Sequence, residues 1–217
     1  MLNSKRGLKE KIVQLYEAWF SVDLESLVET ETYWNEFFLL KPNCKAIESL
    51  LFKLSKEELN QNKNLFSLIF TQSVLILNCD NYIRIANSLV TLFTLSKCLI
   101  KQSIENGLDP IEILIGAKDL EVKLQLLKDN LCNILIMESP QSMKSVVLKI
   151  YSIFLTSHDD INQNPFIQYL VSDELFDAFI SLLANSLTGK AQGYATIMLI
   201  TISINFRKNK VSVNECT

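Results

Sequence analysis

The sequence predicts an all-α protein built from stacked helical hairpins, and three observations support this prediction. Only five glycines and four prolines occur among the 217 residues, and these are the residues that most often interrupt helices. Apolar residues make up 48% of the chain, which is enough for one sizeable core. Apolar side chains recur at helical spacing in one segment after another. The β-branched run ATIMLITISI (195–204) finds no second strand to pair with, so it too is expected to be helical.

Four helices are expected before residue 80. An amphipathic segment covers 8–20, and a shorter one covers 32–40 and stops before Pro42. The stretch CKAIESLLFKL (44–54) places its isoleucine and leucines on one face. Ser55 and Glu58 form the capping-box pattern, which predicts one long helix from there to Leu77.

The second part of the chain continues this pattern. A helix is expected from Tyr82 to about Ser103, and Gly107 supplies the left-handed residue that ends it. Asp109-Pro110 resembles an N-cap followed by proline at the first helical position. The remaining helices are expected over 118–137, 142–156, 166–171, 173–184 and 192–205. Residues 1–205 are therefore expected to form a single domain, and the polar residues 206–217 a frayed tail.

About nine or ten helices with short loops are typical of a helical-repeat stack. Successive helix pairs are spaced about 40 residues apart, which is the range of armadillo and HEAT repeats. We therefore predict an irregular α-solenoid, with a globular helical bundle as the alternative.

Composition excludes several functional classes. The net charge is −3, and no Lys/Arg run is interleaved with aromatic residues, so nucleic-acid binding is not expected. The five cysteines form no CxxC pair, and their scatter suits a reducing cytoplasm. The first twenty residues are amphipathic, unlike a signal peptide. The apolar run 195–204 is too short by about half to cross a bilayer, so no transmembrane segment is expected in this piece.

The segment HDDINQNPF (158–166) contains the only histidine of the chain. His158, Asp159 and Asp160 are the residue types of a metal site or an acid–base pair, which makes a metal-dependent hydrolase the alternative function. A zinc-like site needs further histidine or cysteine ligands, and none are available at suitable spacing. We therefore favour a polar turn between helices. No catalytic, metal or cofactor residue is predicted, and no cofactor is expected.

Three other features have a structural and a functional interpretation. Cys79, Cys98 and Cys132 lie on or at the ends of apolar helices and are expected in the core rather than as nucleophiles. TGKAQGY (188–194) lacks P-loop spacing and favours a glycine-assisted helix start. The cluster YWNEFF (33–38) is either a partner anchor or core, and its one-sided spacing favours core. The helix containing 195–204 is apolar nearly all round, which predicts an outer face covered by further repeats or by another chain.

Several segments together resemble a known family, in order along nearly the whole chain. They are LKEKIVQLYE (8–17), YWNEFFLLKPN (33–43), IRIANSLVTL (83–92), DINQNPFIQYLV (160–171), DELFDAFISLL (173–183) and GYATIMLITISINFRKN (193–209). They resemble the N-terminal portion of the armadillo-like helical domain-containing protein 3 family. Its members are several times longer, and the final residues VSVNECT depart from its pattern, so an N-terminal fragment or a short gene product is expected.

The resemblance implies an armadillo-type fold and a non-enzymatic scaffold or adaptor for protein–protein interactions. It also implies a role in Golgi maintenance and the secretory pathway, in the cytoplasm and peripheral to the Golgi membrane. The family partners are an Arf guanine-nucleotide exchange factor and phosphatidylinositol 4-kinase type III beta. No partner-binding residue is carried over from the family. An importin-like adaptor would require acidic and tryptophan ladders that the sequence does not show.

Overall fold

The computed structural model describes residues 11–20, 31–158 and 160–214, with side chains through Lys208. Within these residues all regular structure is helical, which confirms the predicted fold class. The α-helices are α1 (Lys11–Ala18), α3 (Glu31–Phe37), α4 (Cys44–Leu51), α5 (Lys56–Gln61), α6 (Lys63–Ile76), α7 (Tyr82–Glu105), α8 (Pro110–Leu114), α9 (Leu120–Ile136), α10 (Gln141–Leu155), α11 (Ile167–Leu170), α12 (Asp173–Ala184) and α13 (Lys190–Asn214). A 3-10 turn, η1, covers Ile161–Gln163.

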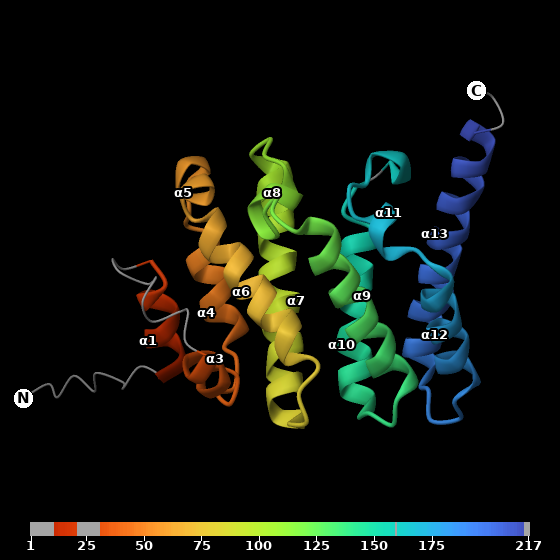
Figure 1. Ribbon diagram of the computed structural model, residues 1–217, viewed down its shortest axis with the longest axis horizontal. Coiled ribbons are helices and arrows are strands. Elements are labelled where there is room, and N and C mark those ends of the chain that lie inside the picture. The colour runs from red at the N-terminus through yellow and green to blue at the C-terminus, as the bar shows by residue number, and fades with distance from the viewer. Residues whose placement is uncertain (1–10, 21–30, 159, 215–217) are drawn as a thin grey trace, which may run out of the picture.

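The helices form two rows. In the first row α4, α7, α10 and α13 contact one another in that order, and α1 packs on α4. In the second row α6, α9 and α12 are neighbours in the same way. The hairpins α6–α7, α9–α10 and α12–α13 join the rows, so each hairpin stacks on the one before it (Figure 1). This arrangement is the predicted α-solenoid, with α1 at one end and α13 at the other.

The repeat length differs from the prediction. First-row helices begin at Tyr82, Gln141 and Lys190, so successive hairpins are separated by more than the expected 40 residues. Short helices account for the difference. α8 lies between the hairpins and packs on α6 and α7, while η1 and α11 lie between α10 and α12.

The helix expected over 55–77 is divided in two. The capping box is present, because the Ser55 amide donates to the Glu58 carboxylate (2.7 Å) and the Glu58 amide donates to the Ser55 hydroxyl (3.2 Å). Asn62 then breaks the helix with φ −96° and ψ 7°. Its side-chain amide donates to the Glu58 carbonyl (2.8 Å), a local bond that competes with helix continuation.

The last helix continues past its expected end at Asn205 to Asn214. Arg207 lies on the first added turn and contacts α12. Its guanidinium lies 2.7 Å from the Asp173 carboxylate and 4.5 Å from the centroid of the Phe176 ring. The helix end expected at Asn205 was therefore wrong, whereas the domain limits 1–205 stay a prediction.

The core runs along the length of the stack, and α7 lies at its centre. Among the described residues, α7 is the one helix long and apolar enough to cross a bilayer, by length and composition alone, although no such segment was expected from the sequence. Most of its apolar stretch, 61%, is buried inside the protein, and α7 contacts α4, α6, α8 and α10. Its composition is thus that of a core helix enclosed by neighbours.

Candidate interaction surfaces

The HDDINQNPF segment forms a polar turn. His158 is exposed, and Asp159 lies outside the described residues. The Asp160 carboxylate accepts hydrogen bonds from the Asn162 backbone amide (2.9 Å) and side-chain amide (3.2 Å), which caps η1. Among the described residues, no group of three or more His, Cys, Asp or Glu side chains is placed to hold a metal. The described part of the cluster therefore offers no observation in favour of the hydrolase interpretation.

Asn164 is the buried polar residue of this turn, with 4% of its surface exposed. The sequence predicts only that Asn164-Pro165 begins the next helix. In the structure its side chain also bonds back to the end of α10, a role that sequence spacing did not reveal.

Of the three cysteines predicted to be core residues, two are buried, and Cys79 is half-buried and packs against the core. Cys98 and Cys132 are buried. Burial, reinforced by the nearby Glu48 carboxylate, raises the pKa of Cys98 to about 11. Burial also raises the pKa of Cys132, whose sulfur lies 3.3 Å from the Tyr151 hydroxyl. Both thiols stay protonated at neutral pH, which does not suit a nucleophile.

The glycine pair of TGKAQGY also has the predicted structural role. The Gly189 amide donates to the Gln192 side chain (3.1 Å) where α13 begins. Gln192 in turn donates to the Gln141 carbonyl (2.8 Å) and the Ser145 hydroxyl (2.9 Å) of α10. The segment therefore attaches the start of α13 to the preceding first-row helix.

The aromatic cluster is core, as predicted. Trp34, Phe37 and Phe38 are 1–2% exposed, and their rings contact one another at centroid distances of 5.0–5.9 Å. Trp19 of the α1 end also packs on Phe37, at 5.6 Å. These rings cannot serve as exposed anchors for a partner, because the first helices of the stack already enclose them.

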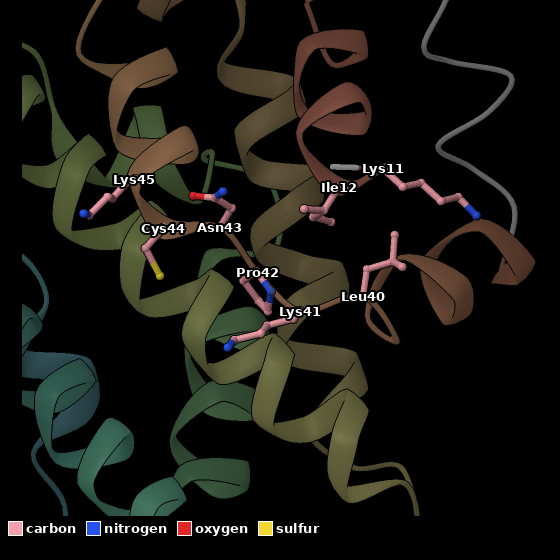
Figure 2. Close-up of a pocket in the computed structure, with 8 residues that line it drawn as sticks. All are labelled: Lys11, Ile12, Leu40, Lys41, Pro42, Asn43, Cys44 and Lys45. Atoms are coloured by element: carbon pink, nitrogen blue, oxygen red, sulfur yellow. The ribbon is translucent and has the colours of Figure 1, made fainter. Parts of the chain in front are cut away.

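A cavity of about 420 Å³ lies between α1 and α4 and carries three lysines. It is lined by Lys11, Ile12, Leu40, Lys41, Pro42, Asn43, Cys44 and Lys45. Figure 2 shows that Lys11 extends to one side of the cavity and Lys45 to the opposite side. Because these ammonium groups diverge, the cavity does not present a convergent anion site.

The outer side of the first row carries a surface that we call the lysine face, formed by Lys45, Lys97, Lys101 and Lys149. Lys97 reaches Glu48 of α4 (3.1 Å), and Lys101 lies over the Phe52 ring at 5.7 Å. Lys149 of α10 lies over the ring of Phe93 of α7 at 5.9 Å. Since Phe93, Lys97 and Lys101 follow each other at four-residue spacing, these contacts lie on one side of α7. All four lysines are exposed.

The second row carries the opposite charge, on a surface that we call the carboxylate face, formed by Glu121, Asp129, Glu174 and Asp177. All four side chains are exposed, whereas neither α9 nor α12 has an exposed lysine or arginine. Lys128 is 6% exposed and lies 3.6 Å from Glu174, which joins α9 to α12. A hydrogen bond from the Ser172 side chain, more than the Lys128 charge, lowers the pKa of Glu174 and keeps its carboxylate ionised.

The hairpin α12–α13 carries a third surface, the end face, which is apolar. It lies at the end of the stack farthest from α1 (Figure 1). Its exposed large side chains, with 39–71% of their surface accessible, are Ile180, Leu183, Tyr194, Ile197, Met198 and Ile204. The opposite side of α13 is buried at Thr196, Leu199 and Ser203. The predicted uncovered outer side of this helix is therefore present among the described residues.

Comparison with known proteins identifies relatives along nearly the whole chain. Armadillo-like helical domain-containing protein 3 of Xenopus laevis is 32% identical over 212 residues, which cover 97% of this chain and 30% of that protein. The proteins of the same name from Homo sapiens and Danio rerio are 31% and 30% identical, over 97% and 98% of this chain. No protein-family model and no solved structure matches. The chain thus spans about 30% of the length of these curated relatives. The resemblance found in the sequence is confirmed, and the chain is a relative of the armadillo-like helical domain-containing protein 3 family.

Proposed function

We propose that the chain is a non-enzymatic scaffold that binds other proteins through preformed side-chain surfaces on a rigid helical stack. The observation that supports this most strongly is the separation of charge between the two rows. The lysine face and the carboxylate face lie on different rows of one stack, so the chain can hold partners of opposite charge at the same time. Such surfaces steer association and select partners by complementarity.

The lysine face is preorganised for binding. Lys97 is paired with Glu48 of the neighbouring helix. Lys101 lies over the Phe52 ring and is paired with Glu105 one turn along its own helix. Side chains with restricted rotamers lose less conformational entropy when a partner docks on them. The expected partner of this face is an acidic protein surface, and the expected partner of the carboxylate face is a basic one.

We further propose that this scaffold works in Golgi maintenance and the secretory pathway, in the cytoplasm and peripheral to the Golgi membrane. Its partners there are an Arf guanine-nucleotide exchange factor and phosphatidylinositol 4-kinase type III beta. The support for these partners is the family resemblance, to which the structure adds two surfaces of the right kind for protein docking.

Affinity purification of the full chain with charge-reversal variants tests this proposal. One variant combines Lys97→Glu with Lys149→Glu, and the other combines Asp129→Lys with Asp177→Lys. Lys118→Glu and Glu138→Lys are matched controls, because both residues are exposed and lie in the loops flanking α9. Circular dichroism and the melting temperature of each variant establish that the fold is intact.

We expect one double variant to lose the kinase or the exchange factor while the controls retain both. Binding should also weaken as salt rises from 50 to 300 mM, since exposed charges are screened. If wild type captures neither protein, the Golgi partners are wrong for this chain. If both double variants capture them as well as wild type does, the charged faces are not the docking surfaces.

A further inference from the structure

We propose that the end face binds a second copy of this chain, so that two hairpins α12–α13 pack against each other around a two-fold axis. This inference goes beyond the scaffold function, which rests on the two charged faces. It depends on the size of the end face, on its lack of charge and on the helical register of its side chains.

The size of the end face suits a stable dimer. Its six large side chains are 39–71% exposed and together present on the order of 650 Å² if each has a total area of about 200 Å². A standard protein–protein interface buries about 800 Å² on each partner. The largest apolar patch on a typical monomer covers about 300–600 Å². The end face alone therefore lies at the lower end of the range of about 600–1,000 Å² that one side of such an interface covers.

The end face can meet itself without charge repulsion. Between Ala178 and Phe206 the only charged residue is Lys190, at the start of α13. In a two-fold dimer each surface faces its own copy, so a charged surface would oppose pairing whereas an uncharged one does not. An acidic or basic partner would gain little here, since it would have to remove its own charges from water without finding opposite ones.

The register of α13 gives the end face the form of a helix-pairing stripe. Tyr194, Ile197, Met198, Thr201 and Ile204 are exposed, and each lies three or four residues from another member of the set, so they share one side of the helix. This is the pattern by which one helix packs lengthwise against another. Ile180 and Leu183 of α12 widen the stripe, because α12 packs beside α13.

The ends of the hairpin are fixed, so the stripe is presented as a rigid surface. Arg207 joins α13 to Asp173 at one end, and Gln192 joins α13 to α10 at the other. A cavity of about 440 Å³ at the Arg207 end is lined by Asp173, Phe176, Asp177, Ile204, Arg207 and Lys208. Charged groups are therefore confined to the margin of the end face, where they remain in water.

Sedimentation velocity and light scattering of the full 24.8 kDa chain test the proposal. We expect wild type to be a dimer at tens of micromolar and to dissociate on dilution. Its melting temperature should rise with protein concentration, as expected when association is linked to folding. The test variant combines Ile197→Asp with Met198→Asp. Both side chains are more than half exposed, so the fold should tolerate the change.

The matched control is Val122→Asp, because Val122 is 68% exposed but lies on α9, away from the end face. We expect the Ile197/Met198 variant to raise the dimer Kd at least 100-fold with unchanged circular dichroism, and the control to dimerise like wild type. Three results would each overturn the proposal: a monomeric wild type at 100 µM, a dimeric Ile197/Met198 variant, or equal weakening by Val122→Asp. The Lys97/Lys149 charge-reversal variant should remain dimeric, because both lysines lie on α7 and α10 and not on the end-face hairpin, so this inference and the scaffold proposal can fail independently.

Discussion

Asn164 is hydrogen-bonded to Phe154 across the turn that contains the only histidine. The Asn164 side-chain amide donates to the carbonyls of Phe154 (2.9 Å) and Leu155 (3.0 Å), at the end of α10. Its side-chain oxygen accepts from the Phe166 amide (2.9 Å), just before α11. The rings of Phe154 and Phe166 also contact each other edge to face, with centroids 4.9 Å apart. One buried side chain therefore satisfies backbone groups at the ends of two helices.

Asn164→Ala should destabilise the protein by about 2–3 kcal/mol, because it leaves buried backbone groups without partners. His158→Ala, at an exposed position, should change the free energy of unfolding by less than about 0.5 kcal/mol. Urea denaturation at pH 7 measures both values. Asn162→Ala is the control for losing an exposed amide from the same turn. Equal changes in the free energy of unfolding at positions 158 and 164 would contradict the conclusion that the Asn164 side chain holds the two helix ends together.

Trp34→Ala should cost about 3–5 kcal/mol, since Trp34 is 1% exposed and packs against Tyr33, Phe37 and Phe38. Leu39→Ala provides the comparison, because Leu39 is 44% exposed and should cost less than about 1 kcal/mol. Thermal and urea unfolding followed by circular dichroism distinguish the two. A small effect at Trp34 would mean that the cluster is an exposed anchor after all.

Gly107 and Gly116 both have positive φ, 63° and 78°, but their surroundings differ. A Cβ at Gly107 meets nothing within 4 Å, whereas one at Gly116 would lie 3.2 Å from the Ser67 hydroxyl. That hydroxyl donates to the Ile115 carbonyl and accepts from the Lys123 ammonium, so it is not free to move. Gly107→Ala should therefore cost about 1 kcal/mol, and Gly116→Ala about 2 kcal/mol or more. Comparable urea midpoints for the two variants would show that the Ser67 side chain can move aside without loss of stability.

Local capping signals in the sequence predicted several helix ends, because each depends on residues within one turn, whereas the break at Asn62 and the continuation past Asn205 were not predicted. The Ser55–Glu58 capping box, the Asp109 N-cap and the Gly107 terminator are all present. Contacts between distant segments were not predictable in this way. Gly116 requires its conformation beside Ser67, and sequence spacing cannot reveal that approach.

The exposed surfaces also depend on contacts between distant segments, so the sequence predicted them only in part. The apolar composition of residues 195–204 predicted an uncovered side for the last helix. Which side chains lie on it depends on how Gln192 attaches α13 to α10, so Tyr194 and Met198 could not be assigned in advance. The lysine face could not be recognised in the sequence. Its members are scattered between residues 45 and 149, and they come onto one row only when α4, α7 and α10 pack side by side.

The stability of the protein at alkaline pH should depend on Cys98. Burial is the main cause that raises its pKa from 9.0 to about 11, ahead of the Glu48 carboxylate. Below pH 9 the thiol is protonated in both the folded and unfolded states, so its contribution to stability is complete. Between pH 9 and about 11 the unfolded chain releases this proton while the folded chain retains it. Stability is therefore lost as pH rises through this window.

Cys98→Ala isolates that contribution, because Cys132 and Tyr151 titrate alike in both proteins. At pH 7.5 the variant should be about 1 kcal/mol less stable than wild type, since it leaves a small cavity in a fully buried position. As pH rises towards 11, wild type should lose up to about 2–3 kcal/mol more than the variant. Urea unfolding at pH 7.5, 9.0 and 10.5 measures the difference. A constant gap between the two proteins would show that the Cys98 thiol ionises as readily in the folded protein as in the unfolded chain.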